Sequence, residues 1–256
     1  MAVATFDTAI TQLATDAPWR WLSAGWRDMK RVPQVSFAYG LAIVVISWAL
    51  VLFLASLDKI WLFLPLAASF VFVGPMLAVG LYEASRRLEA GLPVGLFQVA
   101  FVRTRSPAQL ALLGLTLVLF MLAWVRIATL LFALFFGQSV PPAAQFVSTL
   151  LYTVDGATFL AIGTVVGAGL SFAVFAISAV SVPLLMARDS DAVTAMVISV
   201  RAVLQNFWPM MVWAWVIAVL TVVGIATLFI GLFVIFPLIG HATWHAFREL
   251  VPAEAR

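Results

Sequence analysis

The sequence predicts an all-α, polytopic helical membrane protein with about six transmembrane helices, and three observations support this prediction. Hydrophobic residues make up 64% of the 256 residues and charged residues 10%, against about 45–50% and about 25% in soluble domains. Long apolar runs lack the alternation of β-strands and are of the length that crosses ~30 Å of hydrocarbon. The basic residues fall in short stretches between these runs. A chain of this composition has too little polar surface to be a water-soluble globule.

Six apolar runs define one expected transmembrane domain, residues 19–250, between a polar N-terminal tail, 1–18, and a short C-terminal tail, 251–256. The expected spans are residues 36–57, 60–82, 108–130, 158–186, 208–223 and 225–244. Backbone groups in hydrocarbon must be satisfied within the protein, so runs without strand periodicity indicate helices rather than a barrel. For a bacterial protein this predicts the inner membrane.

The basic residues predict the orientation in the membrane. With six spans, twelve of the fourteen lie on one side: Arg20, Arg27, Lys30, Arg31, Arg86, Arg87, Arg103, Arg105, Arg188, Arg201, Arg248 and Arg256. The positive-inside rule therefore predicts that both termini are cytoplasmic. Because these residues flank membrane spans, we expect them to contact anionic lipid headgroups rather than nucleic acid.

Three similar units are a further expectation, each an amphipathic helix at the cytoplasmic interface followed by a pair of spans. The apolar stripes of these interfacial helices are Trp19, Leu22, Trp26 and Met29, then Leu96, Phe97, Ala100 and Phe101, then Val193, Met196, Val197, Val200, Leu204 and Phe207. Such stripes are typical of helices that lie in the membrane interface. The residues 189–191 suit the start of the third helix.

Prolines give the repeat a second mark. Pro75, Pro183 and Pro237 occur at similar places in the second, fourth and sixth spans, where a proline kinks a helix by freeing a backbone carbonyl. Aligning Pro75 with Pro237 also pairs Glu83 with His245. A true repeat would imply a central seam where the kinked helices meet. The alternative is that prolines are common in membrane helices and that short matches arise by chance.

The histidines are the first candidates for chemistry. His241 and His245 share one helical face, and Glu249 follows one turn further on. Such a face can supply up to three metal ligands, bind haem or handle a proton near neutral pH, and Glu83 is an additional carboxylate through the proposed repeat. The alternative is a set of amphipathic residues where a span leaves the bilayer. The absence of cysteine excludes disulfides, iron–sulfur clusters and thiol catalysis.

Arg126 is the one basic residue inside an apolar run. A charge at the bilayer centre costs roughly 2.5–3.5 kcal/mol, so a central arginine would need a partner or a wet cavity. Counted from Pro107, Arg126 lies about 28 Å along the span, close to the outer headgroups. It is therefore expected to snorkel or to pair with Asp155, and a buried functional cation is the alternative.

Three further features are predicted from residue type and position. Gly163, Gly167 and Ser171 form a row of small residues typical of close helix packing, with a substrate path as the alternative. Residues 137–157 are expected to form an outer loop with a short helix, ending in a turn at 155–156. Tryptophans near span ends are expected to be interfacial anchors; they are Trp19, Trp21, Trp26, Trp61, Trp208, Trp213 and Trp244.

Five segments resemble a family of proteobacterial integral membrane proteins defined by a domain of unknown function, number 2189. They are AGWRDMKRVP (24–33), VGPMLAVGLYEASRRLE (73–89), LAWVRIATLLFALFFG (122–137), FAISAVSVPLLMARDSDAVTAM (175–196) and IFPLIGHATWHAFREL (235–250). Some members are labelled putative cytochrome c oxidase subunit I. A haem-copper catalytic subunit needs about twelve spans and about six histidine ligands. This chain has two histidines, so the resemblance would imply only an accessory or assembly partner.

Two classes of function follow. The sequence contains no P-loop, nucleophile elbow or metalloprotease motif, which favours a non-enzymatic accessory, scaffold or assembly protein. Its partners would be another membrane protein, such as a respiratory complex, or further copies of itself. The alternative is a small-solute or lipid transporter or channel that uses the proline-kinked spans. No cofactor is expected beyond the metal or haem considered at His241 and His245.

Overall fold

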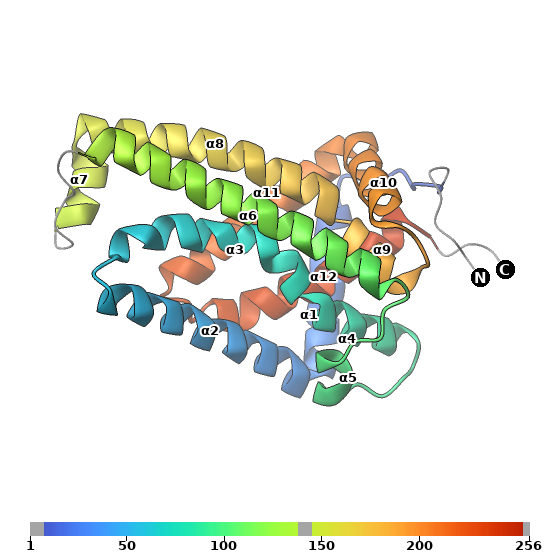
Figure 1. Cartoon of the computed structure of the whole chain (residues 1–256). Coiled ribbons are helices and arrows are strands. Elements are labelled where there is room, and N and C mark those ends of the chain that lie inside the picture. Colours follow the sequence, from blue (N-terminus) through green and yellow to red (C-terminus); the bar gives the residue numbers. More distant parts are fainter. Residues whose placement is uncertain (1–7, 138–144, 253–256) are drawn as a thin grey trace.

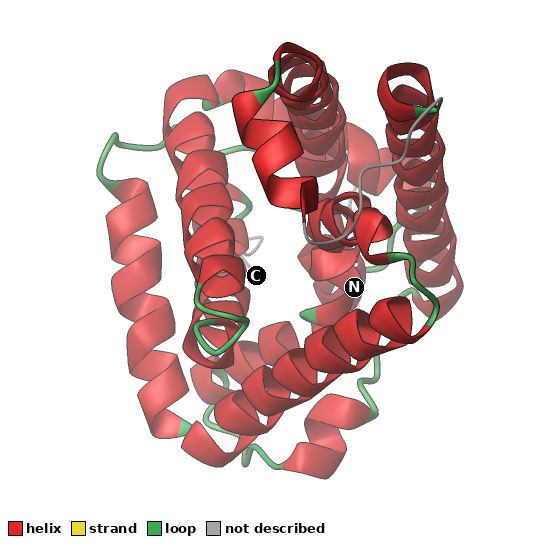
Figure 2. Cartoon of the chain, turned by 90° about the vertical axis from the view of Figure 1, so that its left-hand side faces the viewer, coloured by secondary structure: helices red, strands yellow, loops and turns green. Residues whose placement is uncertain are grey.

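The structure, a computed structural model, describes residues 8–137 and 145–252. Within these ranges the regular elements are helices and none is a strand, as Figures 1 and 2 show. They are α1 (Ala17–Arg31), α2 (Pro33–Ser56), the 3-10 helix η1 (Ile60–Leu62), α3 (Phe63–Leu77), α4 (Val79–Glu89), α5 (Leu96–Ala100), α6 (Pro107–Phe136), α7 (Phe146–Tyr152), α8 (Val154–Ser178), α9 (Ser181–Ala187), α10 (Ala192–Gln205), α11 (Phe207–Ala226) and α12 (Leu232–Leu250).

Five helical segments in the described chain are long and apolar enough to cross a membrane. They are Pro33–Ser56, Pro65–Glu89, Pro107–Phe136, Val154–Ala187 and Phe207–Ala226. The second of these combines most of α3 with α4, and the fourth combines α8 with α9. The predicted all-α, polytopic membrane fold is confirmed.

The sixth predicted span, 225–244, has different bounds in the structure. α11 continues to Ala226, and the turn that follows holds Leu228 and Phe229 at φ angles of 54° and 68°. α12 begins only at Leu232 and is not among the five apolar segments. Its second half carries both histidines together with an arginine and a glutamate, which lowers its hydropathy.

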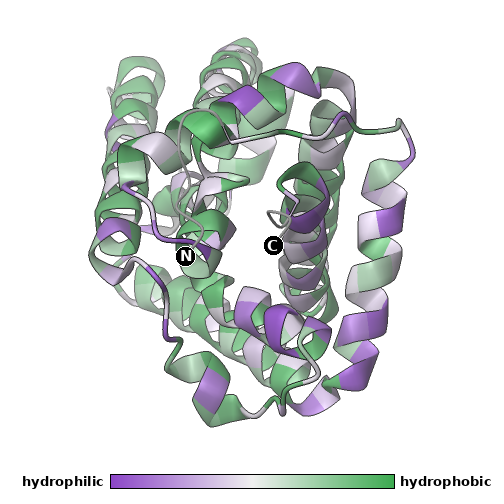
Figure 3. Cartoon of the chain, turned by 90° about the vertical axis from the view of Figure 1, so that its right-hand side faces the viewer, coloured by the Kyte–Doolittle hydropathy of each residue, from purple (hydrophilic) through white to green (hydrophobic). Residues whose placement is uncertain are grey.

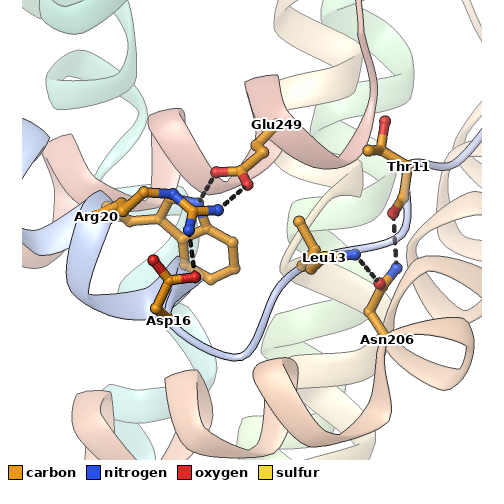
Figure 4. A network of polar contacts seen from close by, with 7 residues as sticks. Thr11, Leu13, Asp16, Arg20, Asn206 and Glu249 are labelled. Carbon is orange, nitrogen blue, oxygen red and sulfur yellow. Dashed lines mark hydrogen bonds and ion pairs between the residues drawn. The ribbon is translucent and has the colours of Figure 1, made fainter.

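α12 nevertheless returns the chain to the end of the bundle where α11 starts. Its last residue, Leu250, accepts a hydrogen bond from the Thr11 amide at 2.9 Å. Asn206, just before α11, donates from Nδ2 to the Thr11 carbonyl at 3.0 Å and accepts from the Leu13 amide at 2.7 Å, as Figure 4 shows. The expected polar tail, 1–18, is thus tied down from Thr11 onward. We call this the polar end of the molecule; α1, α4, α5, α9 and α10 lie there, and α7 lies at the opposite end (Figure 1).

Three glycines set how closely helices pack on α12, which contacts α1, α2, α4 and α11. A Cβ atom on Gly25 of α1 would lie 2.7 Å from the Ala242 backbone nitrogen, and one on Gly40 of α2 would lie 2.0 Å from the Phe233 carbonyl oxygen. On α12 itself, a Cβ on Gly240 would lie 2.6 Å from the Leu81 side chain of α4. Each of these contacts therefore requires a residue without a side chain.

The prolines act differently from one another. Pro183 lies four residues after Ala179, the C-cap residue that follows α8, in agreement with the clash between a proline ring and the carbonyl four residues earlier. Pro75 lies inside α3, which ends two residues later at Leu77, whereas Pro237 lies inside the uninterrupted α12. These prolines do not occupy equivalent places in their helices. They therefore do not support the three-fold repeat, which stays a prediction.

The expected interfacial helices form, and most of their apolar stripes face outward. Phe97 and Phe101 of the second helix are exposed, as are Val193 and Leu204 of the third, which Asp191 caps by accepting from the Thr194 amide at 2.9 Å. The predicted stripe of α1 is only partly right. Trp19 and Trp26 are exposed, but Met29 is buried with Ala17, Trp21, Gly25 and Asp28.

Three of the expected tryptophan anchors are core residues instead. Trp21, Trp213 and Trp244 are each at most 2% exposed. The Trp21 and Trp213 rings meet edge to face with their centroids 5.6 Å apart, so α1 contacts α11 through aromatic packing. Proximity to a span end predicted their position along the membrane normal but not the direction in which they point.

The segment between α6 and α8 agrees with the expected loop in part. α7 forms, and its Phe146 and Leu150 pack inward; residues 138–144 lie outside the described chain. The expected turn at 155–156 is wrong, because Asp155 and Gly156 lie in the first turn of α8. Thr153 caps this helix by accepting from the Gly156 amide at 3.0 Å.

Replacement of Gly40 by alanine is expected to destabilise the protein by about 1–3 kcal/mol, because the new methyl group would collide with the α12 backbone. Gly163→Ala is the control, since a Cβ there meets nothing within 4 Å. The melting temperatures of both variants in detergent provide the measurement. Equal melting of the two variants would contradict the close approach of α2 to α12.

Candidate functional site

An apolar pocket lies between α3, α8, α11 and α12. Its cavity volume is about 100 Å³, and it opens in part to the exterior. Most of its walls are aliphatic or aromatic, with Phe70, Val174, Phe175, Trp213 and Phe236 among the lining residues. Its side-chain polar groups are the indole N–H of Trp213 and hydroxyls from Tyr82, Ser171, Ser178, Thr221 and Thr243. A pocket of this lining suits an apolar ligand that makes few hydrogen bonds.

The pocket lies where the three proline-containing segments meet. Pro75 lines it directly, Ala179 lines it at the break between α8 and α9, and Phe236 lines it next to Pro237. Gly74 adds an open wall, because a Cβ there would meet nothing within 4 Å. The seam expected from the proline positions therefore corresponds to a real space in the structure.

A buried polar network holds the second half of α12 against α1, α2 and α4. Asp28 Oδ2 accepts a hydrogen bond from Ser85 Oγ at 2.7 Å and lies 2.8 Å from His245 Nε2. His241 contacts Ser85 Oγ through Nδ1 at 2.8 Å and Ser36 Oγ through Nε2 at 2.9 Å. Since the Ser85 hydroxyl donates to Asp28, its oxygen is left to accept from His241 Nδ1–H. The network thus fixes the orientation of the His241 ring.

Sequence reasoning missed Asp28, Ser36 and Ser85 of this network. Asp28 has basic neighbours in the chain, a setting typical of a solvated face, whereas it is 5% exposed. Burial raises the pKa of Asp28, but hydrogen bonds from His245 and Ser85 outweigh it, so the pKa lies below its ordinary value. A usable signal was present, since Asp28 shares the spacing of Ala17, Trp21 and Gly25 along one helical face.

The structure does not bring the predicted metal ligands together. Glu249 faces α1, where it pairs with Arg20 and accepts from Trp21 Nε1 at 2.8 Å (Figure 4). His241 has both ring nitrogens engaged by serine hydroxyls. In the described part of the chain, no group of three histidine, aspartate or glutamate side chains could hold a metal.

Glu83, the carboxylate expected near His245, belongs to another cluster. It is 3% exposed and binds Arg86 of its own helix, with 2.6 Å between Nε and Oε2. Arg87 Nη1 lies 3.5 Å from its other oxygen. Asp28 occupies the place that the repeat assigned to Glu83 as the partner of His245.

Arg126 and Asp155 lie on exposed faces of α6 and α8. The ion pair expected between them is not among those formed by the described residues. Arg126 therefore points toward the surroundings of the bundle, and this position favours snorkelling over a buried cation.

The three residues of the small-residue row of α8, Gly163, Gly167 and Ser171, do not share one role. A Cβ on Gly167 would lie 2.9 Å from the Trp124 ring of α6, so this glycine does permit close packing. Gly163 has no neighbour within 4 Å, and Ser171 lines the apolar pocket. Only the middle residue of the row acts as predicted for helix packing.

The apolar segments and the buried polar network define an integral membrane protein built from several helices. Residues 62–187 match the model of a family described as Predicted integral membrane protein (DUF2189), the same family that the five segments resemble. The match runs from the end of η1 to the end of α9 and so includes α3 and α8, two of the four helices around the apolar pocket. Comparison with curated proteins and with solved structures found no match.

The Asp28 network predicts a pH-dependent stability. Because the pKa of Asp28 is lower in the folded than in the unfolded chain, its carboxylate stabilises the fold at neutral pH, and this stabilisation is lost as the pH falls below about 4. Asp28→Asn is expected to lower stability by about 1–3 kcal/mol at pH 7. The gap in melting temperature between wild type and variant should close in acid.

Asp16→Asn is the control for this measurement, since Asp16 directly precedes the same helix, has an exposed side chain and should matter little. A gap that stays constant between pH 7 and pH 3 would contradict the role of the Asp28 carboxylate.

Arg126→Leu is expected to leave membrane yield and melting temperature unchanged or slightly raised, because an exposed charge without an ion pair is replaced by an apolar side chain. Arg86→Leu provides the contrast, since it leaves the buried Glu83 carboxylate with a weaker partner and should destabilise by about 3–5 kcal/mol. A sharp loss of folded protein for Arg126→Leu would indicate a required partner.

Proposed function

We propose that this integral membrane protein is a non-enzymatic lipid-handling protein that binds the apolar part of a lipid in the pocket between α3, α8, α11 and α12. The observation that carries the proposal is the pocket's lining, which combines aromatic and aliphatic walls with a few hydroxyls and one indole N–H as its side-chain polar groups. A hydrocarbon chain needs no hydrogen-bond partners, so it fits these walls.

The same lining argues against a path for small polar solutes. A water-filled passage through a membrane protein is usually lined with charged or amide side chains or backbone carbonyls, and no charged side chain lines this pocket. Transfer of an ion or a sugar into it would leave polar groups of the solute without partners. Among the substrates of a transporter or channel, lipids are therefore favoured over small solutes.

We further propose that the protein resides in the bacterial inner membrane with its polar end in the cytoplasm. α1, α4 and α10 carry basic residues at this end, and Figure 3, which views it directly, shows hydrophilic residues on its helices. Lys59 lies between α2 and η1 at the opposite end (Figure 1). This distribution supports cytoplasmic termini through the positive-inside rule.

An accessory or scaffold role is the second candidate, and α8 is the feature that favours it. The most apolar 18-residue stretch of the span formed by α8 and α9 is 11% buried, the lowest share among the corresponding stretches of the five spans. A Cβ on Gly163 or on Gly169 would meet nothing within 4 Å, and Ala161 and Ala168 are also exposed. Small residues on an outer face allow the close approach of another membrane helix, from a respiratory complex or from a second copy of this chain.

One experiment separates the two roles. The tagged protein is extracted from its own membranes in native nanodiscs and analysed by mass spectrometry for proteins and lipids. A defined lipid retained in stoichiometric amount would support lipid handling. Stoichiometric oxidase subunits, without a retained lipid, would instead support the accessory role and contradict the proposal.

Gly74→Leu tests the pocket itself. A leucine at this position extends into open space within the pocket and is expected to displace lipid that survives detergent extraction, while the protein stays folded. Gly163→Leu is the matched control, because Gly163 also has open space around it but does not line the pocket. Equal lipid retention by the two variants, measured by mass spectrometry, would contradict binding at this place.

A further inference from the structure

A second pocket lies at the polar end and is lined by four arginines. Arg86 comes from α4, Arg103 and Arg105 from the connection between α5 and α6, and Arg248 from α12. Glu89 is the one carboxylate in its lining. Four guanidinium groups around one carboxylate leave the pocket with a net positive charge.

Two of the four arginines form ion pairs with glutamates, and the other two are free. Arg86 is held by Glu83, with 2.7 Å between Nη2 and Oε1, and Arg248 is held by Glu89, with 2.9 Å between Nη2 and Oε1. Arg103 and Arg105 are exposed, and neither forms an ion pair with a carboxylate of the described chain. Their donors are therefore available to a ligand.

The backbone at Arg105 is held by hydrogen bonds to neighbouring segments. The Arg105 amide donates to the Met186 carbonyl at 3.4 Å, and the Ser106 amide donates to the Leu185 carbonyl at 3.3 Å. Ser106 Oγ in turn accepts from the Ser190 amide at 3.1 Å. The segment is thus attached to α9 and to the start of α10, which lowers the entropic cost of ordering the arginines around a ligand.

Exposed aromatic side chains next to the pocket agree with a place near the expected membrane surface. Phe97 and Phe101, just before Arg103 in the chain, are 71% and 68% exposed, with ring centroids 4.9 Å apart. Aromatic side chains exposed on a short helix next to arginines are typical of the headgroup region of a bilayer. A ligand in this pocket can therefore come from the membrane or from water.

We infer that this pocket is a binding site for a phosphate group, with Arg103 and Arg105 as its principal donors and Arg86 and Arg248 as its fixed positive background. Arginine matches phosphate oxygens with two parallel N–H donors, a geometry that lysine lacks. The phosphate belongs either to an anionic lipid headgroup or to a soluble phosphate compound. The site shares no lining residue with the apolar pocket, so the phosphate site and the lipid-handling proposal are independent of each other.

The test compares Arg103→Gln/Arg105→Gln with Lys30→Gln/Arg31→Gln. Both double variants remove two charges from exposed residues of the polar end, and the second leaves this pocket intact. In one arm, the proteins are placed in phosphatidylcholine nanodiscs with a minor fraction of phosphatidylglycerol, and bound lipid is measured by native mass spectrometry. In the other arm, inorganic pyrophosphate is titrated against the proteins in pure phosphatidylcholine nanodiscs.

The Arg103/Arg105 variant is expected to lose binding by at least about tenfold in one arm, while the control changes by less than about twofold. Loss in the phosphatidylglycerol arm identifies a lipid headgroup, and loss in the pyrophosphate arm identifies a soluble phosphate. Equal loss in both variants, or no binding by the wild type in either arm, would overturn the site. Arg103→Lys/Arg105→Lys keeps the charge but not the paired donors, and full binding by this variant would also overturn it.

Discussion

The close packing of α1, α2 and α4 on α12 is the constraint on which the rest of the fold depends. α12 carries polar side chains that hydrocarbon cannot solvate, so its partners must come from the protein. Each neighbour supplies one: α1 supplies Asp28, α2 supplies Ser36 and α4 supplies Ser85. No buried side-chain nitrogen or oxygen in the described chain lacks a hydrogen-bond partner. The glycines at these contacts bring the helices within reach of such short polar side chains.

The sequence predicts the membrane fold well because the relevant signal is large. Runs of about twenty apolar residues admit few alternatives, and the five apolar segments of the structure correspond to five of the six predicted spans. α12 was placed with the wrong bounds because the apolar run through residues 225–235 continues across the turn at Leu228 and Phe229. Hydropathy measures how favourably residues leave water. It does not show where the chain reverses direction within an apolar run.

The candidate sites were harder to predict, because they depend on which helices become neighbours. Asp28 and His245 are 217 positions apart, and a single sequence gives no signal that these two residues are in contact. Spacing did place the two histidines on one face, but it assigned them the carboxylate of Glu249, which binds α1 instead. The seam at the prolines was predicted because a proline acts on its own helix. The residues that line the pocket come from several helices, so the sequence did not predict them.

The position of α12 in the chain has a consequence for how the protein is made. α12 is the last helix of the described chain to leave the ribosome, yet α1, α2 and α4 pack on it. Until it arrives, Asp28, Ser36 and Ser85 have no histidine to bind, so this part of the polar network stays incomplete. α11 and α12 are joined by only a short turn, which favours their insertion together as a helical hairpin. Assembly then becomes a closing step in which the final helix completes a core begun by the first.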